Sequence, residues 1–427
     1  MNICSGVTSS YLTLAKVRLF SIVFVLIFTF PSNASESLED RIKKLEKELE
    51  QQKQDTAKRN LNQLRFAGLV QMDYNQYDGA YNADHQGQTG SDLFVRRVHL
   101  RIFHKVDDKM DYVIVMLADD NTTSLAAGFV RYQPSDKSEI RVGKIKEDRS
   151  LSVQYIGEEL TGERPMMPNA FAVGFQWGAQ GHYVLDNGMR ISAGIFEDKR
   201  YAGDKSGRDN NDKLLLAYNA RGTWANVTNK DVLHFGASYS YKDMGEEAFS
   251  LSERAGIRVA TNKLVFAPEL NSAESANIYV GEFAYQVQSF RFEAEYGNMS
   301  VNSRDPNIGN LSLSGYYLTA NYFIDGQTSS AYNKKYAKFG RPSNEFDVWE
   351  VYARYSVLDL IDHDAGSKAE VSMIGTNYYI NKNLHLQLQY YDTTISGPKT
   401  NTAPFVDVSG THYDQGNAIA ARVSYRF

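Results

Sequence analysis

The chain has 427 residues, enough for one large domain or two to three ordinary ones. It contains 28 tyrosines and 22 phenylalanines but only 9 prolines, a composition that favours β-structure. The formal net charge of −5 argues against a nucleic-acid partner, because nucleic-acid-binding proteins usually carry a basic surface. Mean hydropathy is negative, which excludes a bundle of membrane-spanning helices.

The first segment has the pattern of an export signal. Lys16 and Arg18 precede the apolar run LFSIVFVLIFTF, and the small residues of SNA follow it. A helix needs about 20 apolar residues to cross a bilayer, and this run is shorter. We therefore expect a signal peptide over residues 1–34; an uncleaved anchor is the alternative. The single cysteine, Cys4, lies in this segment, so the mature chain would have no disulfide, which fits a bacterial envelope protein.

Residues 35–60 predict the one clear helix. Its apolar residues Leu38, Ile42, Leu45 and Leu49 alternate spacings of four and three, which is typical of a coiled-coil seam. Charged residues of both signs surround the seam. Because two heptads are marginal alone, we expect a periplasmic coiled-coil segment that depends on an oligomer assembled by the rest of the chain. A solvated helix without a partner is the alternative.

From Leu64 onward every second residue is apolar in segments of about ten residues, such as LHFGASYSY, FRFEAEY, NLHLQLQYY and DVWEVYARYSV. Such segments are long for globular strands but match tilted strands that cross a bilayer. Short connections such as VDDK, LDNG and NKN alternate with long ones, as in a membrane barrel. A closed barrel also leaves no backbone group unpaired in lipid. We therefore predict an all-β fold, a transmembrane antiparallel β-barrel over residues 61–427.

Seventeen segments are candidate strands. They are residues 66–77, 93–104, 110–119, 125–133, 138–145, 172–184, 189–197, 213–224, 231–242, 254–265, 276–287, 290–300, 313–324, 346–357, 370–380, 384–393 and 415–427. With both termini on the periplasmic side the number of strands must be even, so one of the seventeen candidates is not a barrel strand. The segment 254–265 is the one most in doubt. We predict sixteen strands, with eighteen as the alternative, and a last strand, NAIAARVSYRF, that turns Phe427 toward lipid.

No enzyme signature is present: the sequence has no His-Glu-x-x-His, no Gly-x-Ser-x-Gly and no phosphate-cradling Gly-rich loop. The eight histidines are scattered. We predict a protein that is not an enzyme and that uses neither a cofactor nor a metal.

Basic side chains recur on the polar faces of the predicted strands. The candidate pore-lining, anion-binding residues are Arg97, Arg101, Arg141, Lys144, Lys146, Arg221, Arg254 and Arg258. Guanidinium groups match phosphate and carboxylate oxygens, and spaced weak sites let an ion move from one to the next. The alternative is that these groups pair with acids on inward faces, which would give a weakly selective pore. Those acids are Asp73, Glu282, Glu293, Glu295 and Glu350.

Two connections are long enough to matter for the lumen. KEDRSLSVQYIGEELTGERPMMPNA follows the fifth candidate strand, and we expect it to fold inward and narrow the pore; an exposed outer loop is the alternative. The segment Gly326–Glu345 falls on the periplasmic side. Its lysines, Lys334, Lys335 and Lys338, line the exit if it folds inward, or are simply solvated.

Several stretches together resemble the phosphate-selective porin O and P family. They are the N-terminal heptads, FVRRVHL, RVGKIKEDRSL, GERPMMPNAFAVGFQW, EFAYQVQSFRFEAEY, WEVYARYSVLDL and the terminal ARVSYRF. The resemblance implies a sixteen-stranded homotrimer in the bacterial outer membrane, in contact with its lipid. It also implies anion-binding roles for Arg96 and Arg97, for Arg254 and Arg258, and for Lys144 or Lys146. Arg96, however, has lipid-facing parity unless a bulge or a subunit contact hides it.

Taken with this resemblance, the sequence predicts passive diffusion of small anions, phosphate first, through a lumen lined by Arg and Lys. One alternative is a weakly selective general porin. Another is a structural or adhesive barrel with a blocked lumen.

Overall fold

The computed structural model describes residues 43, 44, 46–48, 50, 64–119, 122–157, 159–197, 215–260, 262–307, 309–398 and 410–427. The chain divides into two units, Met1–Asn60 and Leu61–Phe427. In the first unit the described residues are helical and exposed. The predicted signal peptide and the apolar heptad positions lie outside the described residues. No helix in the described ranges is long and apolar enough to cross a membrane.

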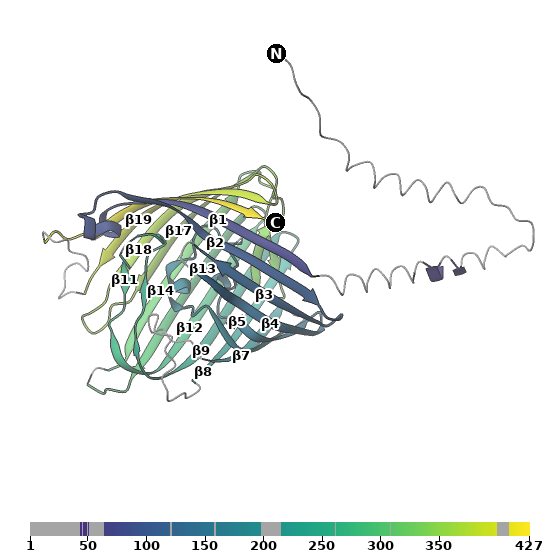
Figure 1. Ribbon diagram of the computed structural model, residues 1–427, viewed down its shortest axis with the longest axis horizontal. Helices are drawn as coiled ribbons and strands as arrows, with labels where there is room; N and C mark the ends of the chain where they lie inside the picture. The colour runs from purple at the N-terminus through teal and green to yellow at the C-terminus, as the bar shows by residue number, and fades with distance from the viewer. Residues whose placement is uncertain are drawn as a thin grey trace, which may run out of the picture. The chain divides into compact units, whose positions relative to one another are not determined.

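The second unit is a closed antiparallel barrel (Figure 1). Its strands are β1 (Arg65–Tyr77), β2 (Gly90–Lys105), β3 (Met110–Ala118), β4 (Thr123–Ser135), β5 (Ser138–Lys146), β6 (Phe175–Val184), β7 (Met189–Glu197), β8 (Leu216–Thr228), β9 (Asp231–Phe249), β12 (Leu270–Val287), β13 (Phe290–Ser303), β14 (Leu311–Phe323), β17 (Val348–Asp359), β18 (Lys368–Tyr379), β19 (Leu384–Ser396) and β20 (Gln415–Arg426). These sixteen strands of the described chain pair in sequence order, and β1 closes the ring by pairing with β20. The predicted count of sixteen is confirmed.

The alternation seen in the sequence sets the two faces of the barrel. On β20 the outward side chains are exposed: Ile419 at 42%, Val423 at 47%, Tyr425 at 49% and, just beyond the strand, Phe427 at 54%. The inward side chains Arg422 and Ser424 are buried. The last residue helps to close the barrel, because the Phe427 carbonyl accepts from the Gly68 amide at 2.9 Å. The apolar outer face and the polar inner face therefore follow from the period of two.

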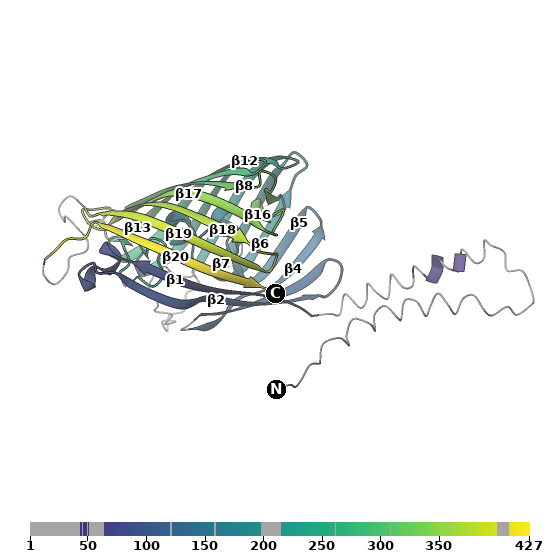
Figure 2. The ribbon, with the colours of Figure 1, turned by 90° about the horizontal axis from the view of Figure 1, so that it is seen from above.

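Several connections carry small elements of their own. They are η1 (Gly79–His85), α3 (Leu151–Gln154), α4 (Met166–Phe171), the two-stranded sheet of β10 (Ser252–Glu253) and β11 (Val265–Phe266), and the two-stranded sheet of β15 (Ser330–Asn333) and β16 (Lys338–Pro342). Two are named for later use: the inward loop, residues 147–174, and the inward hairpin, residues 324–347. We call the end of the barrel where β1 begins and β20 ends the terminal end, and the opposite end the loop end (Figures 1 and 2).

The main apolar core lies inside the barrel. Met167 and Phe171 of α4 pack with Ile257 and Leu264 of the β9–β12 connection against inward residues such as Leu313 of β14, and each of these side chains is at most 1% exposed. The inward loop therefore fills part of the lumen, as the sequence predicts. The burial of Ile257 also agrees with the doubt about one candidate strand: residues 254–260 and 262–264 lie in a packed loop between β10 and β11, so 254–265 is not a barrel strand.

Candidate functional site

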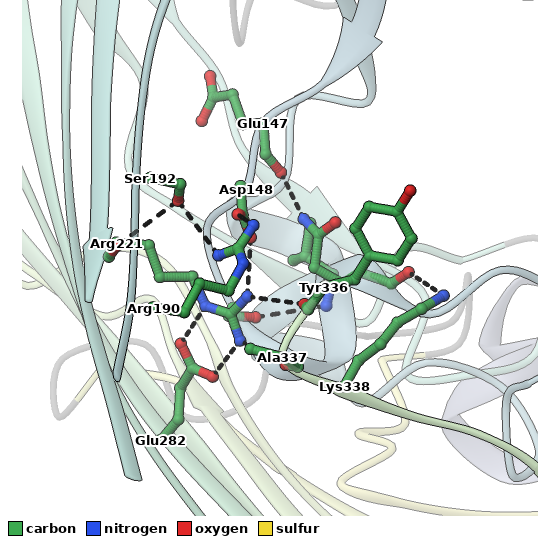
Figure 3. Close-up of polar contacts among 12 residues, drawn as sticks. Glu147, Asp148, Arg190, Ser192, Arg221, Glu282, Tyr336, Ala337 and Lys338 are labelled. Carbon is green, nitrogen blue, oxygen red and sulfur yellow. Dashed lines mark hydrogen bonds and ion pairs between the residues drawn. The ribbon is translucent and has the colours of Figure 1, made fainter. Parts of the chain in front are cut away.

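Buried ion pairs fix the base of the inward loop to the barrel wall (Figure 3). Asp148 accepts from Arg221 Nη1 at 2.7 Å and is also paired with Arg190. The Arg221 fork donates to both oxygens of Glu282, at 2.8 and 2.7 Å. Burial alone would raise the pKa of the Asp148 carboxyl, but Arg190 and Arg221 outweigh it and hold that pKa below its usual range.

The residues on either side of Asp148, Glu147 and Arg149, form a second group of buried ion pairs. Glu147 pairs with Arg149 and with Lys242 of β9. Burial disfavours its charge, yet these two cations lower the pKa of Glu147 to about 2. The loop base is thus held by charges that stay ionised at neutral pH.

The same arginines hold the inward hairpin from the terminal end. Arg221 Nη2 donates to the Ala337 carbonyl at 3.0 Å, and Arg190 Nε donates to the Lys335 carbonyl at 2.7 Å. Lys338 of the hairpin pairs with Glu159 of the inward loop. The sequence left two possibilities open for residues 326–345, and the structure shows that this segment folds inward. Lys338 faces the loop inside the barrel and Lys335 pairs with Glu139, whereas Lys334 is exposed to solvent.

Arg141 lines the interior but is also engaged. Its Nε donates to Glu139 at 2.5 Å, and its guanidinium lies 4.9 Å from the centre of the Tyr336 ring. Like Arg221, it is inward as predicted, yet its partner is an acid of the protein. For Arg141 and Arg221 the alternative of pairing with lumen acids therefore describes the structure better than a free anion ligand does.

A bulge in β2 explains how neighbouring arginines both point inward. Gln71 of β1 pairs with Arg97 and Met72 pairs with Val95, so Arg96 is the extra residue. Its Nε and Nη2 donate to the two oxygens of Glu163 in the inward loop, at 3.0 and 2.9 Å. The lipid-facing parity of Arg96 is thus corrected by one inserted residue.

After the bulge, toward the Lys105 end of β2, the inward side chains form a basic row of Arg97, His99 and Arg101, all partly exposed. Arg97 Nε has no hydrogen-bond partner among the described residues. Lys146, at the end of β5, reaches the carbonyl of Val153 in the inward loop at 2.9 Å. Arg97, Arg101 and Lys146 therefore lie where the sequence predicted, on the lumen side.

Lys144 is a correction. The register of β5 is continuous, and the residues two and four positions before Lys144, Val142 and Ile140, are 56% and 47% exposed on the outer face. Lys144 pairs with Trp177, which is 53% exposed, and its Nζ donates to the Leu125 carbonyl at 2.6 Å. Lys144 therefore lies on the outer face with these residues. Lys146 has the same parity but is the last residue of β5, and its side chain turns inward to the Val153 carbonyl.

Arg254 and Arg258 lie in the packed loop between β10 and β11, not on a strand face. They border a cavity of about 120 Å³ that other basic residues also line. We call its basic residues the mouth cluster: Arg96, Arg164, Arg254, Arg258 and Lys263. The acids of the lining are Glu163 and Glu253, so cations outnumber acids there. Burial raises the pKa of the Glu253 carboxyl above its usual range.

Some functional candidates were missed by the sequence reading. Arg164 and Lys263 lie in loops where parity says nothing. Arg422 is different: the alternation of the last strand already puts it on the inward side, and it pairs with Asp73 at 2.6 Å. Among the described residues, no group of three or more His, Cys, Asp or Glu side chains could hold a metal ion.

Comparison with known proteins shows the family to which this barrel belongs. Residues 64–427 match the family described as phosphate-selective porin O and P. The chain belongs to this family. It is 25% identical to Porin O of Pseudomonas aeruginosa over 407 residues, covering 85% of this chain and 88% of that protein.

Solved structures share the fold at low identity. The anion-selective porin from Comamonas acidovorans superposes with a TM-score of 0.53 at 12% identity, covering 86% of this chain and 99% of that one. OmpT, an outer membrane protein of Vibrio cholerae, gives a TM-score of 0.52 at 10% identity, covering 85% and 97%. This porin is thus an anion channel of the bacterial outer membrane.

Proposed function

We propose that phosphate and similar oxyanions enter this porin at the mouth cluster and pass along the basic row of β2 to the terminal end. We assign that end to the periplasm because most of its connections are short. Transport is passive and involves no covalent chemistry. The observation that carries the proposal is the excess of cations around the 120 Å³ cavity, which continues into Arg97, Arg101 and Lys146. Cationic walls of low dielectric concentrate anions, and several weak sites in a row allow them to leave.

The inward loop and the inward hairpin set the width of this path. Because both are anchored by buried ion pairs, the constriction is a fixed part of the fold. A homotrimer, with a signal peptide over residues 1–34 and a coiled-coil segment over 35–60 that supports the assembly, completes the proposal.

A weakly selective pore is the competing function. It is favoured by the pairing of wall arginines with acids, as in Arg221 with Glu282, Arg141 with Glu139 and Arg422 with Asp73. Since those groups cancel one another, selectivity would depend on the mouth cluster and the β2 row alone.

Planar-bilayer recording separates these functions. In a KCl gradient the reversal potential should favour chloride, and added phosphate should depress the chloride current. Replacing Arg254 and Arg258 by alanine should weaken that block, with Lys144→Ala on the outer face as the control. A reversal potential near zero would support the weakly selective pore, and an absence of any conductance would support a blocked barrel.

A further inference from the structure

The Glu163 carboxylate is bound by the side chains of two arginines. Arg96 offers its fork to both oxygens, at 3.0 and 2.9 Å, and Arg422 donates to one of them as well. Paired, charge-assisted bonds of this kind are how arginine binds a carboxylate or a phosphate. A side chain of the protein therefore fills an arginine site on the path that anions would take.

Arg96 depends on Glu163 for its charge balance, whereas Arg422 does not. The fork of Arg422 also binds Asp73, at 2.7 and 2.6 Å, so it stays paired if Glu163 leaves. Among the described residues, Glu163 is the acid that forms an ion pair with Arg96. Movement of one carboxylate would thus expose the fork of Arg96 beside Arg97.

The carboxylate can move without releasing the loop, because the backbone around it is anchored separately. Arg354 donates to the carbonyls of Thr161 and Glu163, and the Thr161 hydroxyl accepts from Arg291 at 3.1 Å. Arg164 Nε donates to the Ser152 carbonyl at 3.1 Å. The side chain of Glu163 itself borders the 120 Å³ cavity, which gives an arriving ion space next to it.

Given the anion path proposed above, we propose that Glu163 is a built-in competitor: its carboxylate holds the Arg96 site until an incoming oxyanion displaces it. The exchange replaces one anionic partner of Arg96 by another. Net affinity is therefore the difference between two similar interactions, which keeps binding weak enough for the ion to leave. Glu163 is a specificity-determining residue that lowers the affinity of the Arg96 site for oxyanions and so helps the bound ion to leave.

The test is phosphate block of chloride current in bilayers at constant pH, with Glu163→Gln as the first variant. Glutamine keeps the size of the side chain but removes the charge that competes with phosphate. The half-blocking phosphate concentration should fall about tenfold or more, because bonds between charged groups are stronger than those to a neutral amide. The double variant Arg96→Ala, Glu163→Gln should lose this gain, since the site that was freed is then absent.

Glu253→Gln is the matched control. It removes one carboxylate from the same cavity, but Glu253 bonds to Asn169 rather than to Arg96. A general change of potential would affect both variants alike, so the gain in Glu163→Gln should be clearly larger. Folding of each variant is checked by heat-modifiable gel migration and by its KCl conductance.

If Glu163→Gln folds poorly, Glu163→Asp serves instead. The shorter side chain keeps the charge but loses the fork on Arg96, and the half-blocking concentration should still fall. An unchanged or raised half-blocking concentration, or an equal gain in Glu253→Gln, would overturn the competitor role. A wild-type channel that prefers cations would overturn the proposed function instead. A wild type without phosphate block, beside a Glu163→Gln variant that is blocked, would support the competitor role.

Discussion

Replacing Arg221 distinguishes two roles for this residue: binding an anion in the pore, or anchoring the inward loop and the inward hairpin to the barrel wall. Replacing it by methionine removes the cation shared by Asp148 and Glu282 and the donor to the Ala337 carbonyl. Breaking a buried pair by removing one partner costs about 3–5 kcal/mol. Arg190 still holds Asp148, and His234 still lies 3.2 Å from Glu282, so we expect the lower end, about 3 kcal/mol.

Hydrogen exchange measures this loss directly. If the inward loop and the inward hairpin open locally, about 3 kcal/mol corresponds to roughly a hundredfold faster amide exchange in residues 330–342. Single-channel conductance should rise, because the displaced segments fill part of the lumen. Thr223→Val, the next inward residue on β8, is the matched control. Unchanged exchange rates combined with a weaker phosphate block would refute this reasoning and make Arg221 an anion ligand.

Three further outcomes follow from single side chains. Because burial raises the pKa of Glu253, lowering the pH from neutral should protonate it before an ordinary glutamate, add positive charge to the mouth and increase chloride selectivity in KCl; Glu253→Gln should flatten this pH dependence. Lys146→Gln should lower the anion selectivity read from the reversal potential, whereas an equal effect of Lys144→Gln would contradict its place on the outer face. Gly68→Val should destabilise the barrel by about 1 kcal/mol, because a Cβ there overlaps the ring of Phe427, which must turn away into its exposed surroundings. In gel migration after heating, the loss should be rescued by Phe427→Ala.

Parity predicted the direction of most side chains correctly. Arg97, Arg101, Arg141 and Arg221 all point inward, because a strand places alternate residues on opposite faces whatever lies around it. Parity failed at Arg96, where a bulge inserts one residue. Lys144 follows the period of two and lies outside, although its residue type suggested a lumen site. Lys146 has the same parity but turns inward at the end of β5.

The sequence could not predict which inward charges remain available to an ion. Arg422 meets Asp73 across 349 positions of sequence, and Arg221 meets Asp148 across 73. The first pair forms because the barrel closes with β1 beside β20, and the second depends on where the inward loop crosses the lumen. Sequence patterns that repeat every two residues hold no information on contacts of this range.

The sequence by itself determined that this protein is a membrane barrel with an apolar outside and a polar inside, and it favoured sixteen strands over eighteen. The reason is that the pleat of each strand and the need to pair every backbone group in lipid act locally, residue by residue. The tertiary structure alone decided which arginines are neutralised and which face the path of an ion. Closing the ring brings distant strands and the inward loop to within hydrogen-bonding distance, and only then does each charge acquire its partner.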